Sequence, residues 1–182
     1  MSDAVLMAHA RLLERYLSAV REVSGDLPMT EHDPIAASPC EVGEPDPDGH
    51  VLWRPLRRVP PSDLAALQRE ASISLSSDLH SWLSTWWCLP FEATFAGESM
   101  VLLGLAGPAE ERAFGAQLRA HLAVRRKRGE ADTVPVAALF DGRFLTVDNV
   151  SGRVLLESSE RLLGVVSPSL ATLLDKVVPL AL

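Results

Sequence analysis

Apolar positions in the first part of the chain recur with the period of an α-helix. Successive members of the series are four, three, four and three residues apart, which places them on one helix face. They are Leu6, Ala10, Leu13, Leu17 and Val20. Asp3 suits the N-cap, and Gly25 and Pro28 are typical of a helix end. The pattern predicts an amphipathic helix over residues 3–24.

Four further segments show helical patterns. They cover residues 62–70, 76–87, 108–127 and the stretch from Pro168 onward. In the second of these, the spacing puts Trp82 and Trp86 on one face and turns Trp87 away by about 100°. The third has Glu110 and Glu111 in its first turn and a basic end, an order that favours a helix through its dipole.

Strand patterns occupy most of the remaining chain and are joined by short turns. The candidates are 40–42, 51–54, Phe91–Phe95, Ser99–Leu105, Val134–Phe140, Phe144–Asp148 and Arg153–Glu157. The turns Ala96-Gly97-Glu98 and Asp141-Gly142 are hairpin signals. Because hairpins pair strands antiparallel, the sequence predicts an α+β fold. We expect one domain over residues 1–182, with a mainly antiparallel sheet flanked by helices.

Composition favours a soluble cytoplasmic protein. The 182 residues contain only two cysteines, Cys40 and Cys88, which suits a reducing compartment. The longest apolar stretch, Ser99–Gly107, is much shorter than the ~20 residues of a membrane-spanning helix. Polar residues near the start, such as Asp3 and Arg11, interrupt the apolar core that an export signal needs.

The net charge of −7 comes from one segment. Between residues 26 and 53, here called the acidic segment, there is no Lys or Arg. Its seven acids are Asp26, Glu31, Asp33, Glu41, Glu44, Asp46 and Asp48. Of the 24 acids in the chain, 17 are left to balance the 17 Lys and Arg. Such a segment repels phosphate backbones and attracts basic partners, so we expect no nucleic-acid binding.

The residues offer little support for enzyme chemistry. A cysteine hydrolase needs a thiol with a histidine base, and no local motif ties Cys40 or Cys88 to His32, His50, His80 or His121. Cys88 is better explained as a small buried side chain, and Cys40 as the start of a strand. Metal-ligand spacings and phosphate-binding glycine motifs are also missing from the sequence. We therefore expect no catalytic residue, metal, cofactor or small-molecule substrate.

Two clusters allow two interpretations each. Trp82, Trp86 and Trp87 are either two core residues and one partly exposed residue, or an aromatic anchor for a partner. The basic run Arg125–Arg128 is either a solvated helix end or a contact for anionic lipid or RNA.

Short motifs follow one another in order over nearly the whole chain. They are Ser38-Pro39-Cys40, Val51-Leu52-Trp53-Arg54-Pro55, His80 to Trp87, Phe95-Ala96-Gly97-Glu98-Ser99-Met100, Glu110-Glu111, His121-Leu122, Val147-Asp148-Asn149, Ser151-Gly152-Arg153-Val154 and Glu157. This ordered series is similar to that of the Syd family. The Syd family in turn resembles the SUKH superfamily of bacterial immunity and yeast cell-wall regulatory proteins. The resemblance therefore implies a monomeric SUKH-like α+β fold with a concave acidic face and no enzymatic activity.

The resemblance also implies a function: the protein binds basic cytoplasmic loops of the SecY translocon through its concave acidic face and monitors SecYEG assembly. It would then be cytoplasmic and attached peripherally to the inner membrane through SecY. The acids expected to face the partner are Glu31, Asp33, Glu41, Glu44, Asp46, Asp48, Glu92 and Glu98. The alternative is a SUKH-type immunity protein that binds a toxin through the same face.

Overall fold

The computed structural model describes residues 2–181. Its helices are α1 (Asp3–Ser24), α2 (Ala65–Ala71), α3 (Ser77–Ser84), α4 (Pro108–Lys127) and α5 (Leu170–Lys176). Its strands are β1 (Met29–Glu31), β2 (Glu41–Val42), β3 (His50–Trp53), β4 (Leu56–Arg57), β5 (Trp86–Trp87), β6 (Phe91–Phe95), β7 (Glu98–Leu102), β8 (Thr133–Leu139), β9 (Phe144–Asp148), β10 (Val154–Glu157), β11 (Leu162–Ser167) and β12 (Val178–Pro179). The predicted α+β class is confirmed. The first and last positions of the predicted domain, residues 1 and 182, lie outside the described residues.

The main sheet has seven strands in the order β11-β10-β9-β8-β7-β6-β12, and every neighbouring pair is antiparallel. Both predicted hairpins are confirmed. The β6–β7 turn consists of Ala96 and Gly97, each with positive φ, as a two-residue turn between twisted strands requires. Glu98, which we assigned to that turn, already begins β7.

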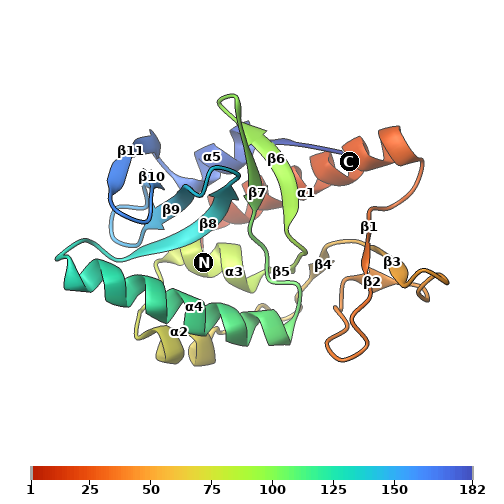
Figure 1. Cartoon of the computed structure of the whole chain (residues 1–182), viewed down its shortest axis with the longest axis horizontal. Helices are drawn as coiled ribbons and strands as arrows, with labels where there is room; N and C mark the ends of the chain where they lie inside the picture. The colour runs from red at the N-terminus through yellow and green to blue at the C-terminus, as the bar shows by residue number, and fades with distance from the viewer. Residues whose placement is uncertain (1, 182) are drawn as a thin grey trace.

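Helices cover the sheet in two groups (Figure 1). α4 packs against α2 and β8, while α1 packs against α3 and α5. Their apolar faces meet the sheet in one continuous core of buried side chains. Gly115 of α4 faces α2, and a Cβ there would be in van der Waals contact with the side chain of Glu70, at 3.4 Å.

The two ends of the chain are joined by arginines of α1. Arg11 forms a bidentate pair with Asp175, at 2.7 and 3.0 Å. Arg15 donates to the main-chain carbonyls of Leu174, Asp175 and Val177. These carbonyls belong to the C-terminal end of α5, where a helix leaves its acceptors unsatisfied. The N-terminal helix thus completes the last helix.

The acidic segment forms a separate sheet of three strands in the order β1-β3-β2. We expected only residues 40–42 of its loop to be extended, and missed β1. That strand is three residues long with mostly exposed side chains, so it shows no apolar alternation and depends on pairing with β3. In β3, Val51 and Trp53 alternate into the core.

Aromatic contacts attach this small sheet to the main body. The ring of Tyr16, on α1, lies 5.6 Å from that of Trp53 and stacks at 4.3 Å on Phe91 of β6. All three side chains are buried. The acidic strands therefore sit on a fixed support.

The predicted helix over 76–87 is wrong at its end. α3 stops at Ser84, and Trp86 and Trp87 instead pair as β5 with β4. The helix is capped at Thr85, whose hydroxyl donates to the carbonyl of Ser81. The guanidinium of Arg58 stacks on Trp87, 3.6 Å from the ring centroid, and helps to hold the extended Trp-Trp pair. Trp82 is buried, while Trp86 and Trp87 are half-buried.

Two helix starts and two strands also differ from the prediction. The N-cap of α1 is Ser2, without a side-chain cap bond, and Asp3 stands in the first turn. α5 begins two residues after Pro168, with the Ser169 hydroxyl accepting from the Thr172 amide. Strands β11 and β12 were not predicted, because β11 is largely exposed on both sides and β12 has two residues.

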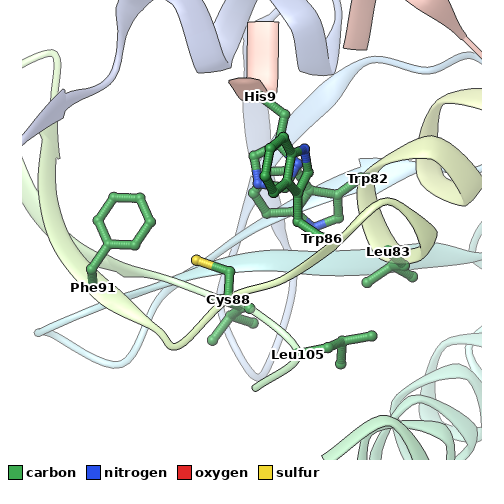
Figure 2. Close-up of a pocket in the computed structure, with 9 residues that line it drawn as sticks. His9, Trp82, Leu83, Trp86, Cys88, Phe91 and Leu105 are labelled. Atoms are coloured by element: carbon green, nitrogen blue, oxygen red, sulfur yellow. The ribbon is translucent and has the colours of Figure 1, made fainter. Parts of the chain in front are cut away.

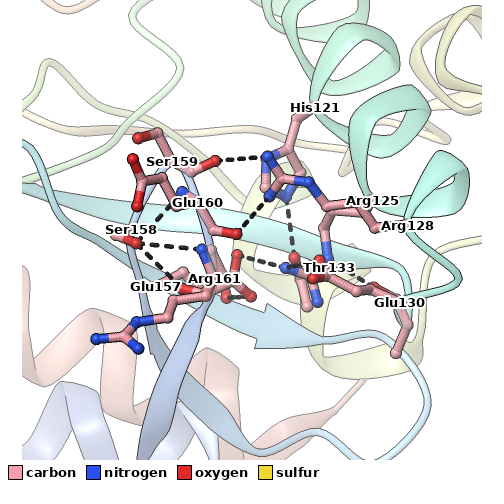
Figure 3. A network of polar contacts seen from close by, with 12 residues as sticks. His121, Arg125, Arg128, Glu130, Thr133, Glu157, Ser158, Ser159, Glu160 and Arg161 are labelled. Carbon is pink, nitrogen blue, oxygen red and sulfur yellow. Dashed lines mark hydrogen bonds and ion pairs between the residues drawn. The ribbon is translucent and has the colours of Figure 1, made fainter.

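The basic run at the end of α4 is largely occupied by internal contacts (Figure 3). Arg125 is buried and lies 2.7 Å from Glu157 of β10, whose other oxygen accepts from Thr146. Arg128 donates to the carbonyls of Ser159 and Glu160. Arg126 pairs with Asp132. These contacts tie α4 to the sheet, so a fully solvated helix end does not describe this run.

Removing Glu157 should destabilise the fold strongly, because the buried guanidinium of Arg125 then loses its nearest carboxylate and keeps only that of Glu130, at 3.3 Å. Glu157→Ala should lower the free energy of unfolding by about 3–5 kcal/mol. Glu157→Gln keeps volume and an acceptor and should cost less. Denaturant unfolding measures both. In the control, Arg119→Ala breaks an exposed pair with Glu70 and should cost under about 1 kcal/mol; equal losses at both sites would contradict the assignment.

Candidate functional site

Most acids of the acidic segment are exposed on the small sheet and its loops. Glu31 ends β1, Asp33 follows it, and Glu44, Asp46 and Asp48 lie in the β2–β3 connection. Figure 1 shows this sheet projecting at one end of the molecule. Because the segment contains no Lys or Arg, its surface carries negative charge without a local basic neighbour in sequence.

Glu41 differs from the other acids because its carboxylate is used internally. One oxygen lies 2.7 Å from Nδ1 of His32, and the other accepts from the amide of Ser38 at 2.9 Å. Its side chain is only 13% exposed. The Ser38 hydroxyl in turn donates to the carbonyl of Ala106, just before α4. Glu41 thus closes the loop 32–38 and holds it against the body.

Two exposed acids shape their loops while keeping oxygen atoms open to solvent. Oδ1 of Asp46 accepts from the amides of Asp48 and His50, at 3.0 and 2.8 Å. Oδ1 of Asp33 accepts from the amide of Ile35 at 2.8 Å. These bonds are local turns of the kind that Asp commonly forms. The loops of the acidic surface are therefore ordered by its own carboxylates.

The structure does not bring Glu98 next to the acidic segment. Glu98 lies at the tip of the β6–β7 hairpin, away from the small sheet in Figure 1, and pairs with Arg143 at 3.0 Å. Glu92 is half-buried within β6, on the face opposite to the buried Phe91 and Ala93. The predicted set is thus divided between six acids on the small sheet and two on the hairpin.

Both cysteine thiols are buried, and the imidazole of His121 is half-buried. Burial raises the pKa of both Cys40 and Cys88, so both stay protonated. His121 bonds to Thr133, and burial lowers its pKa. Within residues 2–181, no three His, Cys, Asp or Glu side chains gather as a metal ion would require.

His9 was missed as a chemically unusual residue. It is buried on α1, with its ring 4.1 Å from that of Trp82, and burial lowers its pKa to about 3. In the sequence it stands among the apolar residues of an amphipathic helix, next to Ala8 and Ala10, and only that position hinted at burial.

Comparison with known proteins decides the family. The family model described as "Syd protein (SUKH-2)" matches residues 7–179. The chain belongs to the Syd family. The resemblance found in the sequence motifs is confirmed, and the match includes the whole acidic segment.

Full-length relatives agree with this assignment. The chain is 30% identical over 181 residues to "Protein Syd" of Aeromonas hydrophila subsp. hydrophila, with 97% of each chain covered. It is 28% identical over 183 residues to "Protein Syd" of Cronobacter sakazakii, with 99% of each covered. It is 30% identical over 171 residues to "Protein Syd" of Klebsiella pneumoniae, and the match covers 91% of this chain and 92% of the relative. No helix of the described part has the length and apolarity to cross a membrane.

The buried thiols should not react in the native protein, because a thiolate is needed for attack and burial disfavours it. A chromogenic disulfide reagent should label neither cysteine under native conditions and both in denaturant. The variant Cys40→Ala/Cys88→Ala should lose about 1–3 kcal/mol of stability. It should keep partner binding. Native labelling at the rate of a free thiol would refute this.

His9 should make folding sensitive to acid. Its pKa is 6.5 unfolded and about 3 folded, so between these values the unfolded chain binds a proton that the folded chain excludes. The free energy of unfolding should therefore fall by up to about 1.4 kcal/mol per pH unit below pH 6.5 from this group. His9→Phe removes the titrating group. The difference in free energy of unfolding between wild type and variant, measured by denaturant titration at several pH values, gives the contribution of His9. A difference independent of pH from 6.5 to 4 would disprove the assignment.

Proposed function

We propose that this protein is a non-enzymatic accessory protein that binds basic cytoplasmic loops of the SecY translocon and monitors SecYEG assembly. The observation that carries the proposal is the acidic segment, an ordered stretch with seven acids, six of them exposed, and no Lys or Arg, in a chain of the Syd family. Basic loops are complementary to this surface in charge. The proposed site needs no cofactor, and we expect the protein to act as a monomer.

Electrostatics would govern encounter with the partner. Exposed charges interact within about a Debye length, ~8 Å at physiological salt, so the attraction steers approach and raises the association rate. Anionic lipids repel the same surface and contribute nothing to attachment. We infer a cytoplasmic protein that is held peripherally at the inner membrane through SecY and released by salt.

The acids would have different roles in this interaction. Glu31, Asp33, Glu44, Asp46 and Asp48 are exposed and would face the partner. Glu41 would act by closing the loop 32–38. Glu92 and Glu98 would be reached by a partner that extends over the β6–β7 hairpin.

Ile35 would add an apolar contact beside these charges. It stands in the loop that Glu41 closes, directly after Asp33 and Pro34, and is 96% exposed. Charge complementarity gives fast encounter, and contact of apolar side chains slows dissociation.

Removing the exposed charges should weaken binding without unfolding the protein. The test variant carries Glu31→Gln, Asp33→Asn, Glu44→Gln, Asp46→Asn and Asp48→Asn. The amides keep the Oδ1 acceptors of the turns at Asp33 and Asp46, so stability should hardly change. Association with purified SecYEG should slow about tenfold or more at low salt, and its salt dependence should flatten. Rates at two salt concentrations measure both effects.

A matched control removes five exposed acids elsewhere. It carries Asp3→Asn, Glu14→Gln, Glu22→Gln, Asp63→Asn and Glu160→Gln, which changes the net charge equally. It should bind SecYEG nearly as the wild type does. Equal affinities and salt slopes for wild type and test variant would sink the acidic-surface mechanism. Retention of the wild type on pure anionic vesicles would refute attachment through SecY.

The description SUKH-2 supports one other candidate, an immunity protein that binds a toxin through the same acidic surface. A pull-down from solubilised membranes, eluted with salt, distinguishes the two. Recovery of SecY supports the translocon function, whereas recovery of a basic toxin domain encoded beside this gene supports immunity.

A further inference from the structure

A small cavity lies between α1, the end of α3 and β5 (Figure 2). His9 and Trp82 border it on one side, and Trp86, Cys88 and Leu105 are among the other lining residues. The space open to the centre of a water molecule is about 10 Å³. That is close to the minimum that one buried water requires, so the cavity is too small for a larger ligand.

Two buried polar atoms belong to the residues of this cavity. Nδ1 of His9 and Nε1 of Trp86 have no hydrogen-bond partner among the described residues. Leaving such a group unsatisfied costs about 1–3 kcal/mol each, and native proteins seldom do so. The two groups are complementary in chemistry, because the indole N–H only donates, whereas the neutral imidazole nitrogen can accept.

The two rings are neighbours, but no hydrogen bond joins them directly. The centroids of His9 and Trp86 are 6.4 Å apart, with the rings edge to face at 65°, and neither nitrogen has a partner among the described residues. A water between the rings could make a hydrogen bond of about 2.9 Å to each nitrogen. A buried water needs at least two polar partners, and these residues supply them.

We propose that one ordered water occupies this cavity, accepts a hydrogen bond from Nε1 of Trp86 and donates one to Nδ1 of His9. The water joins α1 to β5, two elements that share no direct hydrogen bond among the described residues. It also fixes His9 as the neutral tautomer with its proton on Nε2, since Nδ1 is the acceptor. Burial of the imidazole, which lowers its pKa to about 3, keeps it in the neutral form that this geometry needs.

The backbone is closely packed in one wall of the cavity. Gly104 lines it, and a Cβ at this position would lie 2.2 Å from the carbonyl oxygen of Cys88. A side chain there would have to displace the backbone of Cys88, so residue 104 must be a glycine for this wall to form. The volume of the cavity leaves room for one water.

A crystal structure of the full chain at about 1.5 Å resolution tests the proposal directly. It should show one density peak within about 3.2 Å of both nitrogens. An empty cavity, or a peak in contact with only one of them, would overturn it. In solution, the indole proton of Trp86 should show direct cross-relaxation with a slowly exchanging water, and its absence would likewise count against the bridge.

A variant pair separates the bridge from packing. Trp86→Phe keeps an aromatic ring but removes the donor, so the ¹⁵N resonance of His9 Nδ1 should shift as its bond to the water changes. Trp87→Phe removes an indole that does not line the cavity, and should leave that resonance unchanged. Equal responses to both changes would show that no bridge exists. Because the wild-type measurements need no variant, a folding defect in Trp86→Phe leaves the test intact.

Discussion

The contact of Tyr16 with Trp53 and Phe91 is the interaction on which the acidic surface depends. β1 and β2 each carry a glutamate, the loops of the small sheet carry further acids that repel them, and a three-stranded sheet of this size has little core of its own. Trp53 gives the sheet a buried side chain, and Tyr16 receives it between α1 and β6. Burial raises the pKa of Tyr16, so the phenol stays neutral in this contact. Without this attachment, the acids would lie on a loop with no fixed orientation.

The carboxylates of the acidic segment have two different roles, which a count of charges does not distinguish. Both oxygens of Glu41 are bonded within residues 32–38, whereas Asp46 uses one oxygen for its turn and stays exposed. A charge count treats these residues as equal contributors to the field. Their exchange for amides would differ: at Glu41 it disturbs the loop, and at Asp46 it removes charge while leaving the turn. The Glu41 loop also positions Ile35, so charge and apolar contact share one support.

Much of the fold follows from local pattern. The period of α1, the charge order of α4 and the turn at Asp141-Gly142 each specify their elements within one segment, and the structure confirms them. The helix over 76–87 was extended too far because Trp86 has helical spacing, yet its strand conformation depends on pairing with residues 56–57. β11 has no alternation to detect. For the site, sequence located the charged segment, but the role of Glu41 and the separation of Glu98 arise from contacts between distant residues.

The joining of α1 to α5 has a consequence for the order in which contacts form during folding. Arg11 and Arg15 are separated from their partners at residues 174–177 by between 159 and 164 positions in the sequence. Contacts between such distant segments carry the cost of closing a long loop, whereas the hairpins close short ones. The contacts of α1 with α5 should therefore form after the β6–β7 and β8–β9 hairpins. The acidic strands, anchored to α1 through Tyr16, would acquire their final orientation only with this late step.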